Sequence, residues 1–234
     1  SFIFLTTDLA SIPSRPVGRT RLAASTNPES SSQAIKYFAT AVAGLDFVLS
    51  LPLWFLYKPD GAEFQFATKL DWIPSVGVQY IFGVDGFAIL LILLTTLLGL
   101  IAIYSSYTAI THRVKEYYVF LLLLQVGMLG VFCSLDFILF YVFWEVMLVP
   151  MYFLIGVWGG PRKLYAAIKF FLYTFLGSVL MLVSFIYLYY QANHSFDILA
   201  FHQVKLGMTA QILIFLAMFS AFASAGVAWA GPQT

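Results

Sequence analysis

Charged residues are scarce in this chain: they make up 10% of its 234 residues, whereas hydrophobic residues make up 61%. Soluble domains carry about 25% charged residues, so this composition excludes an ordinary soluble domain and indicates an integral membrane protein. The formal net charge is only +1, and the basic residues are spread along the chain, which argues against nucleic-acid binding. The single cysteine, Cys133, excludes an internal disulfide framework.

Motifs for nucleotides and redox cofactors are also missing. The chain has neither a glycine-rich dinucleotide fingerprint after a strand nor a Walker phosphate loop. His112, His194 and His202 fall in expected loops, whereas a membrane haem needs histidines that face each other within helices. His194, Asp197 and His202 could bind a metal, but their spacing matches no strong pattern, and solvated loop residues are the simpler interpretation. We therefore expect no directly bound cofactor and no metal site.

Long apolar runs dominate what is present. Each is close to the ~20 residues that a helix needs to cross a bilayer, and lipid offers no partner for the amides of an open strand. The sequence therefore predicts an all-α polytopic transmembrane helix bundle of about six helices. They are expected at about residues 36–57, 84–107, 117–134, 137–158, 166–190 and 209–229.

The connections between these runs indicate how the helices are arranged. Residues 58–83 form a long amphipathic connection that we expect on the membrane surface, and the short connection 134–136 predicts a tight antiparallel hairpin. Basic residues favour the side that holds the N-terminal segment and the two connections near residues 113 and 162, which is therefore predicted to face the cytoplasm or matrix. That side holds Arg15, Arg19, Arg21, Lys36, Arg113, Lys115, Arg162 and Lys163, against Lys58, Lys69 and Lys205 on the other.

An acidic residue, Glu145, interrupts the apolar run 137–158. A charge at that depth costs about 3 kcal/mol on insertion scales, so such an acid usually has a function. Pro150 cannot donate to the carbonyl of Val146, which leaves a free acceptor and a loosened turn beside the carboxyl group. Burial favours the neutral form, which suits a group that binds and releases protons. We predict a proton-relay residue; the alternative is a protonated acid that only bonds another helix.

Lys169 is another ionisable residue within a predicted span, about one turn inside the helix at 166–190. Its side chain could extend to the membrane surface, or it could turn inward and share a proton path with Glu145. Glu145 and Lys169 are the candidate site residues. Asp85 and Asp136 each precede a predicted helix, where an acid is favoured by the helix dipole, and we interpret both as stabilising helix starts.

The stretch from Leu135 to Ser178 reads LDFILFYVFWEVMLVPMYFLIGVWGGPRKLYAAIKFFLYTFLGS. Its motifs F-x-x-F-W-E-x-x-L-V-P-M-Y and W-G-G-x-x-x-x-x-A-A-x-K-F-x-x-Y-T resemble the signature of the antiporter-like subunits of respiratory complex I. The resemblance is to subunit M, which is called subunit 4 in mitochondria and has a counterpart in the related photosynthetic complexes. It extends from about Ile35 to about Ala223.

This resemblance implies that Glu145 corresponds to the key glutamate of the family's fifth transmembrane helix. That glutamate takes part in proton translocation through a half-channel, coupled to quinone reduction elsewhere in the complex. The implied protein is a subunit of a proton-translocating NADH:quinone oxidoreductase that does not itself bind NADH; the parent complex uses NADH and quinone. Its implied partners are other membrane subunits of complex I, the lipid bilayer and protons. The implied location is the bacterial inner membrane, or the thylakoid or mitochondrial inner membrane.

The chain departs from this family at both ends. Residues 1–34 do not resemble the family's first helix, and we expect them to be disordered or artefactual. Residues 35–223 are expected to form the N-terminal half of the antiporter-like domain, and residues 224–234 diverge. Ala225 stands at about the place of the family's buried lysine, the expected partner of Glu145. We therefore expect a truncated or frameshifted fragment that is inactive alone.

Two alternatives to the complex I assignment remain. A multisubunit cation/proton antiporter or a membrane-bound hydrogenase contains a subunit of the same ancestry. A non-functional membrane fragment is the other alternative.

Overall fold

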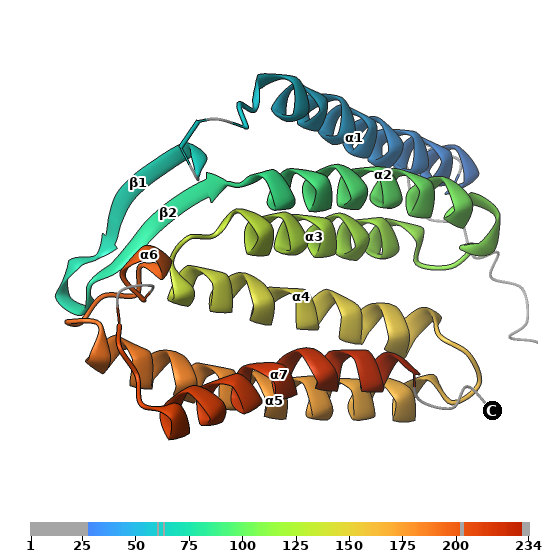
Figure 1. The fold of residues 1–234 in the computed structure, drawn as a ribbon. Helices are drawn as coiled ribbons and strands as arrows, with labels where there is room; N and C mark the ends of the chain where they lie inside the picture. Colours follow the sequence, from blue (N-terminus) through green and yellow to red (C-terminus); the bar gives the residue numbers. More distant parts are fainter. Residues whose placement is uncertain (1–27, 60, 63, 202–203, 231–234) are drawn as a thin grey trace, which may run out of the picture.

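The computed structural model describes residues 28–59, 61–62, 64–201 and 204–230. Within them, long helices run side by side, with α1 at one edge of the bundle and α5 and α7 at the other (Figure 1). A short helix, α6 (Ile198–Phe201), precedes the last of them. The long helices are α1 (Pro28–Leu56), α2 (Gly86–Ala109), α3 (Val114–Cys133), α4 (Phe137–Trp158), α5 (Lys163–Gln191) and α7 (Met208–Ala230).

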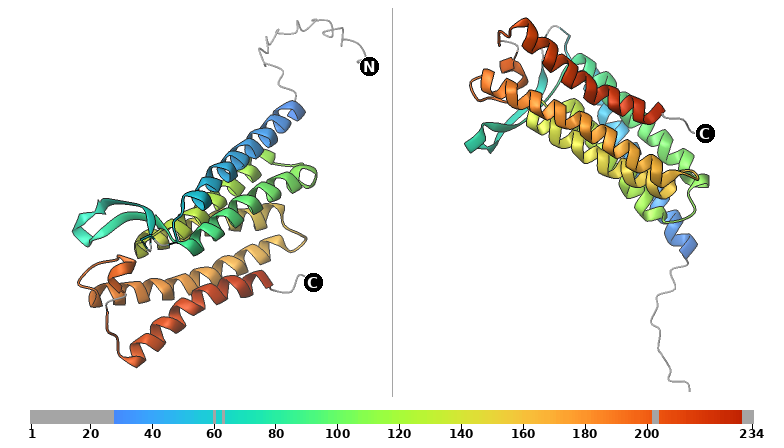
Figure 2. Two further views of the ribbon diagram at one scale, coloured as in Figure 1. Left: turned by 45° about the horizontal axis from the view of Figure 1, so that its top comes forward. Right: turned by 90° about the horizontal axis from the view of Figure 1, so that it is seen from below.

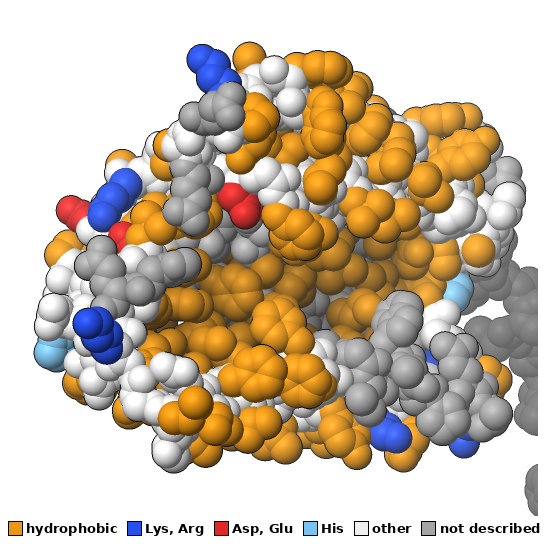
Figure 3. Space-filling view, in the orientation of Figure 1, with side chains coloured by type: hydrophobic (Ala, Val, Ile, Leu, Met, Phe, Trp, Pro, Cys, Tyr) orange, Lys and Arg blue, Asp and Glu red, His pale blue; other side chains and the backbone are white. Residues whose placement is uncertain are grey.

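These helices confirm the predicted transmembrane bundle. Helices α2 to α5 and the segment Ser32–Leu56 of α1 are each long and apolar enough to cross a membrane, and α7 contains a shorter apolar stretch, Met208–Ser224. Hydrophobic side chains cover most of the face in Figure 3, which is hollowed in the middle, and most of the charged side chains lie toward its margins. This distribution suits a body surrounded by lipid rather than water.

Helix α1 begins earlier than the expected residue 36. Pro28 occupies its first position, which suits proline because the first helical residue has no intrahelical acceptor for a backbone N–H. The first turns of α1 therefore come from the segment 1–34 that we had set apart, while residues 1–27 lie outside the described residues.

Neighbouring helices pack in chain order, and α1 also contacts α3. Small residues bring α3 close to α4: a Cβ on Gly127 would lie 2.5 Å from Cγ of Met147, and one on Gly130 would overlap the Phe143 ring. The bundle can therefore be described as two groups, α1–α2–α3 and α4–α5–α7, which join at this tight α3–α4 contact.

Residues 65–84 form a β-hairpin, an element that the expected all-α fold did not include; the surface location expected for this connection stays a prediction. Strand β1 (Gln65–Ile73) pairs antiparallel with β2 (Val78–Val84) through the turn η1 (Pro74–Val76). Gly77 closes the turn with φ of 73°, a conformation that glycine adopts without steric cost. Hydrogen bonds between β1 and β2 satisfy the backbone groups of this connection outside the helical bundle.

The hairpin and α6 lie at one end of the bundle, which we call the hairpin end (Figures 1 and 2). The start of α1 and the α2–α3 and α4–α5 connections lie at the opposite end, the loop end. Lys36, Arg113 and Arg162 therefore share one end, as predicted, whereas Arg15, Arg19 and Arg21 lie outside the described residues. That the loop end faces the cytoplasm or matrix stays a prediction.

Candidate proton-relay site

The α4–α5 contact sets the level of Glu145 in the bundle. The rings of Tyr152 and Phe171 lie 5.8 Å apart, so these antiparallel helices face each other there. Moving seven residues in opposite directions, about 10 Å along each axis, brings Glu145 level with Ser178. Tyr141, one turn before Glu145, lies close enough to interact with both side chains. Glu145 therefore faces a hydroxyl-bearing part of α5.

The carboxyl group of Glu145 is incompletely bonded. Its Oε1 atom is buried and has no hydrogen-bond partner among the described residues, and the same holds for Nε1 of Trp144. Trp144 stacks on Phe140 and meets Phe222 of α7 edge to face, so aromatic rings line this part of the site. A buried acceptor without a partner is costly, so Oε1 is an atom with unused hydrogen-bonding capacity.

Pro150 lies inside α4 and is buried, and the helix continues through it. Because proline has no backbone N–H, the carbonyl of Val146 lacks the donor that an ordinary residue would supply. This acceptor follows Glu145 directly in the chain. The helix is uninterrupted at this turn, and its loosening remains a prediction.

The structure does not bring Lys169 and Glu145 together. Lys169 lies about nine residues, or about 14 Å, closer to the loop end than the level of Glu145. Its Nζ lies 6.0 Å from the ring centre of Tyr165 and 5.8 Å from that of Tyr173. Both rings are exposed, so Lys169 is on the outward face of α5. Its place in a proton path stays a prediction.

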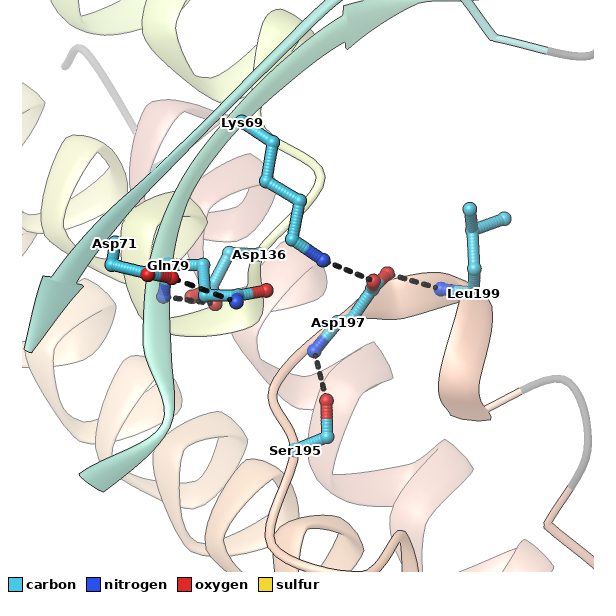
Figure 4. A network of polar contacts seen from close by, with 7 residues as sticks. All are labelled: Lys69, Asp71, Gln79, Asp136, Ser195, Asp197 and Leu199. Carbon is cyan, nitrogen blue, oxygen red and sulfur yellow. Dashed lines mark hydrogen bonds and ion pairs between the residues drawn. The ribbon is translucent and has the colours of Figure 1, made fainter. Parts of the chain in front are cut away.

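Asp136 is fully buried and caps α4, as predicted for a helix start. Its Oδ1 accepts hydrogen bonds from the backbone of Ile138 (2.9 Å) and Leu139 (3.1 Å). Its Oδ2 accepts from the backbone of Gln79 in β2 (3.1 Å), a tether that the sequence did not reveal (Figure 4). Burial raises the pKa of Asp136 more than these three bonds lower it, and nearby Asp197 raises it further. Asp136 thus fixes the hairpin to α4.

Asp85 also caps a helix as predicted, because its Oδ1 accepts a hydrogen bond from the backbone of Ala88 in α2 (2.7 Å). Asp197 instead pairs with Lys69 at 3.9 Å and accepts a hydrogen bond from the backbone of Leu199 (Figure 4). Within the described part of the chain, no three His, Cys, Asp or Glu side chains are placed to hold a metal ion. His202 lies outside that part.

Asp46 is an acid within the membrane-spanning part of α1, and it is missing from the residues predicted from the sequence. Its Oδ2 accepts a short hydrogen bond from Nε2 of Gln125 on α3. The sequence signal that indicates Glu145 also indicates Asp46, because each is a lone acid inside an apolar run. Gln125 is the other polar residue that this signal would have found, because it interrupts a run of leucines.

Comparison with known proteins bears on the family. Residues 134–229 match the family model described as "NADH:quinone oxidoreductase/Mrp antiporter, TM". NADH-quinone oxidoreductase subunit M of Rickettsia conorii is 40% identical over 191 residues, which cover 81% of this chain and 38% of that protein.

Two solved structures share the fold. A chain of respiratory complex I from Thermus thermophilus with bound NADH superposes with a TM-score of 0.72 and 25% identity, covering 82% of this chain and 41% of that one. A chain of the Mrp complex from Dietzia superposes with a TM-score of 0.68 and 19% identity, covering 85% of this chain and 21% of that one. The chain spans about two fifths of the length of the curated relatives it matches. The chain is thus similar to the NADH:quinone oxidoreductase/Mrp antiporter transmembrane family over residues 134–229, and to a subunit M over 191 residues.

Proposed function

We propose that this chain forms part of a proton-translocating membrane subunit of an NADH:quinone oxidoreductase, in which Glu145 binds and releases the proton. The observation that carries this proposal is the buried, unpartnered Oε1 of Glu145, which stands level with Ser178 and close to Tyr141. The 40% identity to a subunit M supports the parent complex. The chain itself would hold no NADH or quinone, and other membrane subunits would be its partners.

The geometry suggests how the carboxyl group works. Oε1 can accept a hydrogen bond from a water molecule or bind a proton, and the hydroxyl of Tyr141 can both donate and accept a hydrogen bond. The free carbonyl of Val146 provides a further acceptor on the same helix. Lys169, between the level of Glu145 and the loop end, is the candidate to carry protons on that side.

Replacing Glu145 by Gln in the full-length subunit of an assembled complex tests this role. Gln keeps the size and a hydrogen-bonding end but cannot exchange a proton. A positioned acid–base group contributes a factor of about 100 or more to the rate of a proton-transfer step, so we expect the rate of pumping to fall by about 100-fold or more. Proton uptake by vesicles, measured with a pH-sensitive dye, reports it.

Glu116→Gln is the matched control. Glu116 lies in the first turn of α3, where it is exposed and pairs with Arg113, and its loss should leave pumping unchanged. Undiminished pumping in Glu145→Gln would contradict the proposed role.

Lys169 has a separate test. If it carries protons toward the loop end, Lys169→Gln lowers pumping. Lys163→Gln does not, because Lys163 is exposed and its Nζ donates to the carbonyl of Val157 near the end of α4. Equal pumping in both variants would remove Lys169 from the path.

Cation/proton antiport is the second candidate, because the family model that matches residues 134–229 is described as covering Mrp antiporters as well. A sodium-driven pH change in vesicles without an electron donor would support it. Dependence of pumping on NADH and quinone would support the first proposal.

A further inference from the structure

Three helices meet at Asp46. Gln125 of α3, whose side chain is 4% exposed, donates from Nε2 to Oδ2 of this acid. Helix α2 admits the Gln125 amide only because Gly99 has no side chain, since a Cβ at Gly99 would overlap that amide. The sequence therefore builds a place inside the α1–α2–α3 group where an acid meets an amide.

No basic group among the described residues is at hand to compensate a charge on Asp46. Lys36 lies about ten residues, or about 15 Å, away along α1, and its Nζ donates to the carbonyl of Tyr107 at 2.7 Å. The ionisable residues of α2, α3 and their caps all lie toward the two ends of these helices. Toward the loop end are Tyr104, Tyr107, Arg113, Lys115, Glu116, Tyr117 and Tyr118, and at the hairpin end are Asp85 and Cys133.

An amide suits a protonated acid better than a carboxylate in this setting. It offers both a donor and an acceptor, so it can bond either oxygen of the neutral group. It carries no charge, so an ionised Asp46 would remain uncompensated in the membrane, where each lone charge costs about 3 kcal/mol or more. The Asp46–Gln125 contact therefore places an acid within the span beside a neutral amide instead of a compensating base.

A further polar contact lies one turn after Asp46 on the same face of α1. The hydroxyl of Ser50 shares a hydrogen bond of 3.1 Å with that of Thr96 on α2, and both residues are buried. Polar groups therefore continue from Asp46 toward the hairpin end.

The depth of this contact matches that of Glu145. Gln125 lies about eight residues before the end of α3, and Glu145 lies about eight residues after the start of α4. At 1.5 Å per residue, both are about 12 Å from the hairpin end, and Asp46 is about 15 Å from the end of α1.

We propose that Asp46 is a second proton-binding residue of this chain, separate from Glu145, and that it exchanges its proton with water. Its ligand is the proton itself, delivered as hydrated protons. This role does not depend on the activity proposed for Glu145.

Infrared spectroscopy of the purified full chain in lipid vesicles tests the proposal directly. A protonated carboxyl group gives a carbonyl band that a carboxylate lacks, and the band shifts when water is replaced by deuterated water. We expect part of this band to persist at pH 7, to shift in deuterated water, and to disappear in Asp46→Asn. Glu145→Gln is the control, which leaves the Asp46 component in place.

Two outcomes would overturn the proposal. An unchanged band in Asp46→Asn would show that Asp46 holds no proton, even if that variant unfolds at a lower temperature. A component that does not shift in deuterated water would show a permanently protonated structural group.

Discussion

Three acidic side chains are held in places with little water, and each has a different set of partners. Asp136 accepts three backbone hydrogen bonds, Asp46 accepts one from an amide, and Oε1 of Glu145 accepts none from the described residues. A carboxyl group whose oxygens are fully bonded holds segments in place. One with unused bonding capacity can take up and release a proton, so the number of partners separates the structural acid from the proposed proton carriers.

The pH dependence of stability should reveal the burial of Asp136. Burial raises its pKa in the folded chain above the ordinary value of 3.8, so the folded state binds the proton more tightly than the unfolded state. Its contribution to stability is therefore greatest below the usual aspartate range and is lost as pH rises through the raised folded value.

As pH rises from about 4 to the raised pKa of Asp136, the wild type should lose stability relative to Asp136→Asn, because Asn cannot ionise. Thermal unfolding of the purified chain in detergent from pH 4 to 8 measures this difference. Asp71→Asn, at an exposed position of β1, serves as the control. Parallel profiles for wild type and Asp136→Asn would contradict the expectation.

At the scale of elements, the helices could be predicted and the hairpin could not. A bilayer fixes the length of a spanning helix, so apolar runs alone located each long helix within a few residues, except for the start of α1. The thickness of the bilayer does not fix the length of the strands, which belong to a connection between two helices. In β1 the apolar Phe66, Leu70 and Trp72 alternate with the polar Lys69 and Asp71, a signal of strand structure that the search for spans passed over.

The same limit applies to the sites. Glu145 and the two capping aspartates stand out in the sequence because each breaks or begins an apolar run. The contacts of Asp46 with α3 and of Asp136 with β2 join residues far apart in the chain, so only the packing of the helices shows them.

The tight α3–α4 contact makes a prediction about stability. Gly130→Ala would drive a methyl group into the Phe143 ring, and overpacking of this kind costs about 1–3 kcal/mol. Gly44→Ala is the matched control in a helix, because its nearest neighbour, Leu100, would lie 4.0 Å away.

The control should be neutral or should gain up to about 1 kcal/mol from the better helix propensity of alanine. Reversible unfolding in detergent and denaturant compares the two variants. Equal stability of both would show that Gly130 does not limit the approach of α3 to α4.

For the whole molecule, the distribution of basic residues predicts the orientation in the membrane. Ser75 in the hairpin turn and Gly160 in the α4–α5 connection are both exposed and lie at opposite ends. In a Cys133→Ser background, Ser75→Cys and Gly160→Cys place a single thiol at each end.

In intact cells, a thiol reagent that does not cross membranes should label the first variant and not the second, because basic segments remain inside. In inside-out vesicles the pattern should reverse. Labelling of Gly160→Cys in intact cells would place the loop end outside.

The similar depth of Asp46 and Glu145 has an electrical consequence. A proton that moved between them would travel nearly parallel to the plane of the membrane. A full crossing is worth about 2.3 kcal/mol per charge at 100 mV, and a step of about 3 Å in a core of about 30 Å captures only about a tenth of that. Such a step would be almost independent of voltage, so electrical work would fall on the steps that connect each acid to water.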